Sequence, residues 1–371
     1  ACYAVGATIQ ASQENGFALV RPPGHHTNKD KAMGFCVFNN TAIAVKKLLD
    51  EGKKVFILDF DCHYGNGTAE IFYNEPNVVY MSLHQYPYYP GSGHIDQIGQ
   101  GKAKGHIINI PIPPKTGDDM YIEIISYFIP IIKEEFKPDV VCCGAGFDGH
   151  HSDPICDLNY SLNAYYETGR LLSENFKKVF ATLEGGYDPK WLAKCAMSFK
   201  DGINGLKPNF KEDKTETSDY NKKKLYENLE ELKDNLKAYW KLSDSDYPKR
   251  FVDKFIMGGK EVFLRPLKKE DRSLWLEMFD CFSPETRRFR FFKHIKKMPD
   301  IQVDNYIYND YCNEIPIVPV IKEDGKEKIL GVGRLQGSKE EAEFAIVIVD
   351  EWQGKGLGEK LLDYCVKVAK K

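Results

Sequence analysis

The sequence predicts an α/β protein built around a parallel β-sheet. Short, unbroken apolar runs, such as residues 55–58 and 139–144, alternate with longer segments of helical periodicity. An apolar run without polar alternation is typical of a strand buried on both faces, as in a parallel sheet. Glycines and a side chain suited to chemistry follow several of these runs. Ligands of open parallel sheets bind beyond the carboxyl ends of the strands, so we expect a functional site there.

The composition limits the possible function classes. The chain has 371 residues, 42% hydrophobic and 28% charged, which is typical of a water-soluble protein of two or three domains. Its net charge of −3 predicts no general affinity for nucleic acid, and no apolar run reaches the ~18 residues of a membrane span. None of the ten cysteines has C-x-x-C spacing, and Cys142 and Cys143 lie in an apolar run. We therefore expect a cytoplasmic protein with reduced, buried thiols rather than disulfides or a thiolate zinc site.

Hydrophobic periodicity defines the elements of the first half in order. We expect helices over residues 1–15, 41–51, 117–136, 160–176 and 223–242. We expect strands over residues 17–20, 55–58, 77–83, 107–112, 139–144 and 178–183. Residues 207–222 are polar and predict a loop. The helix after this loop is expected to cover the first domain with the apolar residues Leu225, Leu229, Leu232, Leu236 and Tyr239.

The stretch 53–68 carries the chemical pattern around which the other motifs are arranged. After the apolar run, Asp59, Asp61 and His63 stand at alternate positions, so in an extended segment their side chains share one face. Two carboxylates and an imidazole are unfavourable to bury unless a cation lies among them, and a divalent metal fits best. The alternative is the end of a surface strand with a polar loop, which the preceding apolar run disfavours.

Two further motifs follow predicted strands. One adds a third ligand to the metal site, and the other adds a base beside it. Asp148 comes after the run 139–144 and can supply a third ligand, which leaves open positions as in a catalytic zinc site. His25 and His26 lie in a loop fixed by two prolines and a glycine, and such a pair can supply a general base. A base needs an acceptor on its other ring nitrogen, for which Asp59 and Asn66 are the nearest candidates.

Two more loops predict a hydrogen-bond donor and a wall for the site. Tyr187 follows two glycines and can donate a hydrogen bond to a developing oxyanion. The aromatic loop 86–93 suits the wall of an apolar slot, although a packed loop without function has the same composition. Together with the metal ligands and the histidine pair, these groups predict metal-assisted hydrolysis of an amide.

Seven motifs over about residues 1–241 resemble the zinc-dependent histone deacetylase family. They occur in the order and spacing of that family, which includes acetylpolyamine amidohydrolases and acetoin-utilisation proteins. The motifs are RPPGHH, GFCxFNN, DFDCHYGNGT, MSLH, YYPGSG, GAGFD and LEGGYD. The resemblance implies an arginase/deacetylase-like parallel-sheet domain over residues 1–242. The family's first strand and the loop after it have no counterpart here, so we expect a domain truncated at its N-terminus.

The resemblance assigns a role to each motif residue. The implied zinc ligands are Asp61, His63 and Asp148. The implied catalytic residues are His25, His26, Tyr187, Asp59 as the partner of the first histidine, and Asn66. Class I members carry aspartate where this chain has Asn66, so the sequence resembles the class II and bacterial branch.

The resemblance also implies a substrate channel and a second ion site. Phe35 and Tyr89 match the aromatic pair that lines the acyl-lysine channel, beside Gly34. The residues that match a monovalent-cation site, such as one for K⁺, are Asp59, Asp61, His63, Ser82 and Leu83.

The last third of the chain predicts a separate α/β domain. Strands are expected near 261–267, 315–321, 327–335 and 342–349, and helices near 269–281 and from 359 to 371. A glycine-rich turn between a strand and a helix forms a nest of N–H groups suited to a pyrophosphate, although a flexible turn is the alternative. The segments VFLRPLKKED, SPETRRFRFF and AEFAIVIV-DEWQGKGLG resemble the GNAT acetyltransferases, especially bacterial protein-lysine acetyltransferases.

This second resemblance implies an acetyl-CoA site and a possible base. The residues that match the acetyl-CoA loop are Gln353, Gly354, Lys355, Gly356, Leu357 and Gly358, and Glu343 matches the general base. We expect a linker over 243–258 and a GNAT domain over 259–371 that is truncated at its C-terminus. An incomplete sheet would leave an unpaired edge, so we expect this chain to lack acetyl transfer.

We therefore expect a bifunctional protein with Zn²⁺ and acetyl-CoA as cofactors. Its first domain would deacetylate acetyl-lysine in proteins through metal-activated water. One alternative is an amidohydrolase of acetylpolyamines or other small molecules. Another is an inactive acyl-lysine binding module, which the presence of Tyr187 disfavours. The sequence defines neither the acylated substrate nor the oligomeric state.

Overall fold

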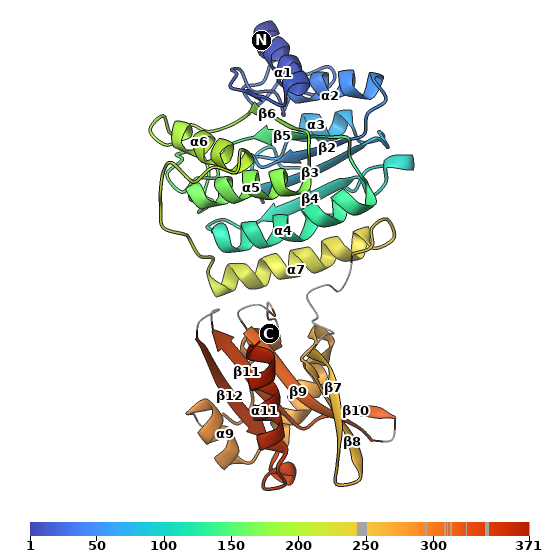
Figure 1. Ribbon diagram of the computed structural model, residues 1–371, viewed down its shortest axis with the longest axis vertical. Coiled ribbons are helices and arrows are strands. Elements are labelled where there is room, and N and C mark those ends of the chain that lie inside the picture. Colours follow the sequence, from blue (N-terminus) through green and yellow to red (C-terminus); the bar gives the residue numbers. More distant parts are fainter. Residues whose placement is uncertain are drawn as a thin grey trace. The chain divides into compact units, whose positions relative to one another are not determined.

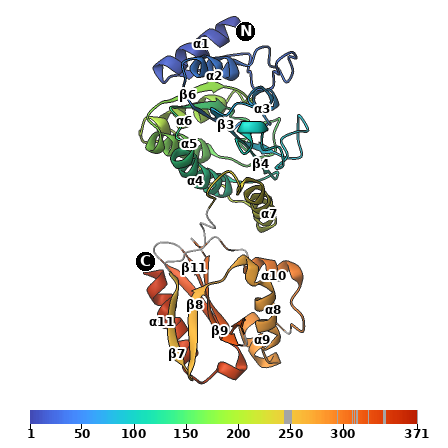
Figure 2. The ribbon, with the colours of Figure 1, turned by 90° about the vertical axis from the view of Figure 1, so that its right-hand side faces the viewer.

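The computed structural model divides the chain into two compact units, Ala1–Leu242 and Ser243–Lys371. Figures 1 and 2 show both, and each is described by itself. The structure describes residues 1–242, 251–293, 295–307, 309, 311, 314–323, 325–337 and 341–370. Across these residues no helix is both long and apolar enough to cross a membrane.

The first unit contains a six-stranded sheet in the order β1-β6-β5-β2-β3-β4, and every neighbouring pair is parallel. Its strands are β1 (Phe17–Ala18), β2 (Val55–Asp59), β3 (Val78–Gln85), β4 (Ile107–Ile112), β5 (Val140–Ala145) and β6 (Val179–Leu183). Every residue of β2, β3, β4, β5 and β6 is buried. The prediction of a parallel sheet from unbroken apolar runs is therefore confirmed.

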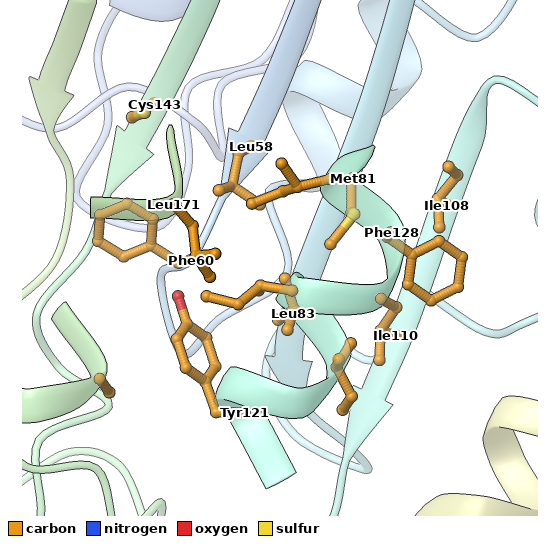
Figure 3. Packing of buried hydrophobic residues seen from close by; sticks show 14 of the residues in the cluster. Leu58, Phe60, Met81, Leu83, Ile108, Ile110, Tyr121, Phe128, Cys143 and Leu171 are labelled. Atoms are coloured by element: carbon orange, nitrogen blue, oxygen red, sulfur yellow. The ribbon is translucent and has the colours of Figure 1, made fainter. Parts of the chain in front are cut away.

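Helices cover both faces of this sheet because alternate residues of each strand point to opposite sides. The helices are α1 (Cys2–Glu14), α2 (Asn40–Asp50), α3 (Asn66–Ile71), α4 (Asp118–Glu135), α5 (Leu162–Asn175), α6 (Leu192–Ile203) and α7 (Asp219–Leu236). On one face, Ile57 and Tyr80 pack with α1, α2 and α3. On the other, Leu58 and Met81 pack with Tyr121 and Phe128 of α4, as Figure 3 shows.

Helix α7 begins and ends a few residues earlier than expected. Its leucines Leu225, Leu229, Leu232 and Leu236 are all buried, as their helical spacing predicted, and the helix packs beside β4. Tyr239 lies beyond the helix and is partly exposed. The short helix α3 and the helix α6 were not predicted from the sequence.

The second unit contains a mainly antiparallel sheet in the order β12-β11-β9-β8-β7, with β10 paired to β9. Its strands are β7 (Asp253–Met257), β8 (Lys260–Pro266), β9 (Glu314–Glu323), β10 (Lys326–Ile329), β11 (Gly331–Gly337) and β12 (Ala342–Ile348). Its main helices are α8 (Arg272–Asp280), α9 (Pro284–Phe291), α10 (Asp300–Ile307) and α11 (Leu357–Ala369). Figure 2 shows α11 on one face of the sheet and α8, α9 and α10 on the other.

Two sequence expectations for this unit need correction. The linker expected over 243–258 contains β7, which pairs with β8 in an antiparallel hairpin, whereas residues 243–250 lie outside the described residues. The single strand expected over 327–335 is two strands separated at Leu330. Both strands pair with β9, β10 with Val320–Glu323 and β11 with Glu314–Ile317.

The expectation of fully reduced cysteines is wrong for one pair. Cys62, which follows β2, forms a disulfide with Cys156, which lies in the loop before α5. The two residues are 94 positions apart, so no local spacing could indicate the pairing. Cys142 and Cys143 are free and buried, as expected.

Candidate active site

Three ligand-type side chains meet where β2 and β5 end. Asp61 and His63 follow β2, and Asp148 follows β5, the neighbouring parallel strand. His63 Nδ1 lies 2.9 Å from Asp148 Oδ2 and 3.2 Å from Asp61 Oδ1. All three residues are buried. The structure therefore brings together the three side chains that the sequence spacing grouped. The distances from His63 to the two carboxylates are far shorter than the ~6 Å beyond which two ligands could not share one zinc ion.

Backbone N–H groups hold both carboxylates in place. Gly185 N–H donates to Asp61 Oδ2 at 2.6 Å, and Cys62 N–H donates to Asp148 Oδ1 at 2.9 Å. Glycine is required for this approach, because a Cβ on Gly185 would lie 2.3 Å from Asp148 Oδ2. A Cβ on Gly146 would likewise lie 2.3 Å from Asp61 Oδ2. The backbone thus forms part of the wall around the three side chains.

The electrostatics of these side chains fit a cation. Burial lowers the pKa of His63, but hydrogen bonds to Asp148 and Asp61 outweigh it and raise this pKa to about 11. Burial and the charge of Asp61 raise the pKa of Asp148 to about 6. Positive charge is therefore favoured among these side chains. Two oxygen donors and one imidazole nitrogen are a donor set that zinc accepts, so the residues present fit this metal.

The histidine pair lies beside the carboxylates, with each Nδ1 facing an acceptor. His25 Nδ1 is 3.1 Å from Asp59 Oδ2, and His26 Nδ1 is 2.8 Å from Asn66 Oδ1. The Asn66 amide donates from Nδ2 to Asn28 Oδ1 at 3.0 Å, which orients its oxygen toward His26. Each imidazole therefore carries its proton on Nδ1 when neutral and offers Nε2 to the site.

The two histidines differ in protonation. Burial lowers the pKa of His25, but the charges of Asp61 and Asp59 outweigh it and raise this pKa to about 10. Burial and the charge of His25 lower the pKa of His26 to about 3. The surroundings of His26 thus favour its neutral form, and the carboxylates around His25 favour its cationic form. An acid and a base in adjacent positions are what hydrolysis of an amide requires.

Glu184 is a buried carboxylate in this region that sequence reasoning overlooked. Its Oε2 accepts hydrogen bonds from the N–H groups of Gly24 at 2.7 Å and His25 at 3.0 Å, and its Oε1 accepts one from Thr41 at 3.1 Å. It follows β6 and lies within the LEGGYD motif, which was the available indication. Glu184 holds the backbone of the histidine loop against the sheet.

Tyr187 lies beside the predicted channel residues. Its ring centroid is 5.9 Å from that of Phe35, and its N–H donates to Asp153 Oδ2 at 2.7 Å. Burial raises the pKa of Tyr187 well above its usual range, so its hydroxyl remains a donor. Phe35 is 73% exposed, as expected for the rim of an opening.

Tyr89 lies beside His26 and His63. Its ring centroid is 5.1 Å from that of His26 and 6.2 Å from that of His63, while the residue stays 44% exposed. The aromatic loop 86–93 therefore borders the site. Gly34 has φ of +57°, and a Cβ there would lie 2.3 Å from the His26 ring, so glycine is needed for the close approach.

The residues expected to bind a monovalent cation lie at and just after the end of β2 and in the neighbouring strand β3. The strand register places Asp59 opposite Ser82, which Leu83 follows. Asp59 also accepts a hydrogen bond from the Tyr80 hydroxyl at 2.9 Å. Ser82 Oγ lies 3.0 Å from His84 Nδ1.

The glycine-rich turn of the second unit has the expected form. Strand β12, the turn and helix α11 follow in order, and Gly356 caps α11 with φ of +87°. Gln353 Nε2 donates to Ile348 O at 2.8 Å and ties the turn to the strand. Glu343 on β12 lines a cavity of about 540 Å³ together with Arg290 and Arg334.

Comparisons with known proteins agree with this geometry. A model of the histone deacetylase domain matches residues 1–203, and a model of the acetyltransferase (GNAT) family matches residues 275–371. A probable deacetylase of Archaeoglobus fulgidus is 44% identical over 200 residues, which cover 50% of this chain and 56% of that protein. The chloroplastic histone deacetylase 10 of Oryza sativa subsp. japonica is 39% identical over 191 residues, covering 51% and 41% respectively.

A solved structure shares the fold of the first unit. The crystal structure of the HDA15 HD domain aligns with a TM-score of 0.57 and 31% identity, covering 63% of this chain and 68% of that one. The chain spans about half the length of the two relatives above, 56% and 41%.

Proposed function

The chain belongs to the histone deacetylase family, and from that premise we propose that its first domain is a zinc-dependent deacetylase of acetyl-lysine in proteins. The observation that carries the proposal is the meeting of Asp61, His63 and Asp148 beside two histidines whose Nδ1 atoms face Asp59 and Asn66. Zinc held by these three residues would polarise the amide carbonyl and lower the pKa of a water molecule.

The protein's own groups then carry the proton transfers. His26 Nε2 accepts a proton from the attacking water, because its Nδ1 proton is engaged with Asn66. His25, whose Nδ1 faces Asp59, stabilises negative charge that develops on the substrate. The Tyr187 hydroxyl donates a hydrogen bond to the oxyanion, and His26 finally returns the proton to the leaving amine. Phe35 and Tyr89 flank the acyl-lysine chain. A monovalent cation such as K⁺ beside Asp59 and Ser82 belongs to the same proposal.

An assay on two substrate classes with controlled metal content tests this function. We expect the purified chain to deacetylate an acetyl-lysine peptide with a higher kcat/KM than an acetylated polyamine. Removal of metal by a chelator should abolish turnover, and Zn²⁺ should restore it, while circular dichroism shows the fold unchanged. A preference for the polyamine would favour a small-molecule amidohydrolase. Peptide binding without turnover in the zinc-loaded protein would favour a binding module.

We also propose that residues 353–358 bind the pyrophosphate of acetyl-CoA in the GNAT domain. The N–H groups of this turn precede α11, whose N-terminus carries partial positive charge. Gly354 and Gly356 both have positive φ, which directs successive N–H groups to one side.

Gly356→Val is expected to weaken acetyl-CoA binding by about tenfold or more. A β-branched residue at φ of +87° is strained by ~1–2 kcal/mol, so the turn would lose its N–H arrangement. Calorimetric titration with acetyl-CoA measures the effect. Gly325→Val is the matched control, since Gly325 also has positive φ of 79° but lies in the turn between β9 and β10. Equal losses in both variants, or none at Gly356, would contradict the assignment.

A further inference from the structure

A second group of metal-type donors lies outside the candidate active site. His150 and His151 follow β5, and Glu212 lies in the loop between α6 and α7. His150 Nε2 is 3.1 Å from Glu212 Oε2, and His151 Nε2 is 2.7 Å from Glu212 Oε1. One donor atom from each residue lies within 4.8 Å of the other two. Both imidazoles therefore direct their Nε2 atoms to the carboxylate of Glu212.

Neighbouring groups fix the position of His150. The residue is 1% exposed, and its ring stacks on that of Trp191, with centroids 4.8 Å apart, and on that of His151, with centroids 4.4 Å apart. Its Nδ1 lies 2.8 Å from Ser152 Oγ and accepts a hydrogen bond from the Ser152 N–H at 3.3 Å. These contacts hold the ring in place with its Nε2 directed at Glu212.

Glu212 is anchored and charged. Its Oε2 accepts a hydrogen bond at 2.9 Å from the N–H of Leu162, the first residue of α5. Burial raises the pKa of Glu212, but the hydrogen bonds from Leu162, His151 and His150 outweigh it and lower this pKa. The carboxylate is therefore an anion that points at both imidazoles. His151 is exposed, which leaves the group open to solvent on one side.

We propose that His150, His151 and Glu212 form a second site for a divalent transition metal such as Zn²⁺. Two imidazole nitrogens and a carboxylate oxygen are a donor set of zinc sites, and the exposed side leaves room for water as a fourth ligand. The site would join the loop after α6 to the segment between Asp148 and Asp153. That segment carries a ligand-type residue of the active site and the acceptor for the Tyr187 N–H.

Calorimetric titration of the metal-free chain with Zn²⁺ tests the proposal. We expect two equivalents to bind to the unmodified chain. Glu212→Gln and His151→Ala should each bind one equivalent fewer, or bind it at least tenfold more weakly. His94→Ala is the matched control, because His94 is an exposed imidazole that is 3.0 Å from Asp96. This variant should bind as much zinc as the unmodified chain.

A second readout locates the ion directly. Cu²⁺ quenches nearby indoles, so binding at His150 should quench Trp191, and Trp191→Phe should remove that part of the fluorescence loss. If Glu212→Gln and His151→Ala both keep the full zinc stoichiometry and affinity, the proposal is wrong. The unmodified chain could instead bind a single equivalent of Zn²⁺, and Glu212→Gln could lose it. That result would support the second site and contradict zinc binding at the candidate active site.

Discussion

Tyr187→Phe is expected to lower kcat for deacetylation of an acetyl-lysine peptide by about 10²–10³-fold while zinc stays bound. The phenylalanine ring fills the same space beside Phe35, and the Tyr187 N–H keeps its hydrogen bond to Asp153. Only the hydroxyl is lost, and this hydroxyl is not one of the proposed zinc ligands. Because its hydrogen bond strengthens as the oxyanion forms, kcat should fall more than the affinity for substrate.

Steady-state kinetics with parallel zinc analysis measures this effect. Tyr166→Phe is the matched control, since it also removes a tyrosine hydroxyl, one that donates to Leu206 O on the outside of α5. Its kcat should stay within a few-fold of the unmodified chain. Near-normal turnover of Tyr187→Phe with zinc retained would remove this tyrosine from the mechanism. A purely packing role for Tyr187 would produce that outcome.

Asp148→Asn is expected to lose bound zinc and with it all measurable deacetylation. Asparagine Oδ1 can still accept the hydrogen bond from Cys62 N–H, so the turn after β5 keeps its anchor. The negative charge beside His63 is lost, and with it an anionic ligand. Changes around zinc ligands typically weaken binding by ~10–100-fold, so loss of a ligand should exceed that range.

Zinc content after dialysis, measured with circular dichroism on the same sample, checks this result. Asp157→Asn is the control from the same loop, because Asp157 is exposed and pairs with Lys115. It should retain zinc and turnover. A folded Asp148→Asn protein that holds zinc as tightly as the unmodified chain would show that Asp148 is not a ligand.

The sequence predicts the sheet of the first unit well, because a strand that is buried on both faces is apolar at successive positions. Residues 55–58 are uninterrupted apolar positions, and the structure places them at the centre of the sheet. The meeting of Asp61 with Asp148 was also predictable, although 87 positions separate them. Parallel strands end at the same edge, so residues that follow neighbouring strands come together whatever their separation.

Features that depend on backbone contacts or on pairings between distant residues have no recognisable pattern in the sequence. Glu184 acts through the N–H groups of Gly24 and His25, which no side-chain pattern reveals. The pairing of Cys62 with Cys156 depends on the fold of the intervening chain. The short helix α9 is polar and buries no residue, so its periodicity gave no prediction. Glu212 lies in a polar loop whose path the sequence does not define.

The glycines that enclose Asp61 have a genetic consequence. A change at the first or second base of a glycine codon gives a residue with a side chain or, for GGA to TGA, a stop, and at Gly146 or Gly185 even a single added carbon would lie 2.3 Å from a carboxylate oxygen. Neither residue has a side chain with which to contact substrate. First- and second-base changes at these two codons are therefore expected to disturb the candidate site, although neither codon encodes a side chain, whereas third-base changes keep the glycine.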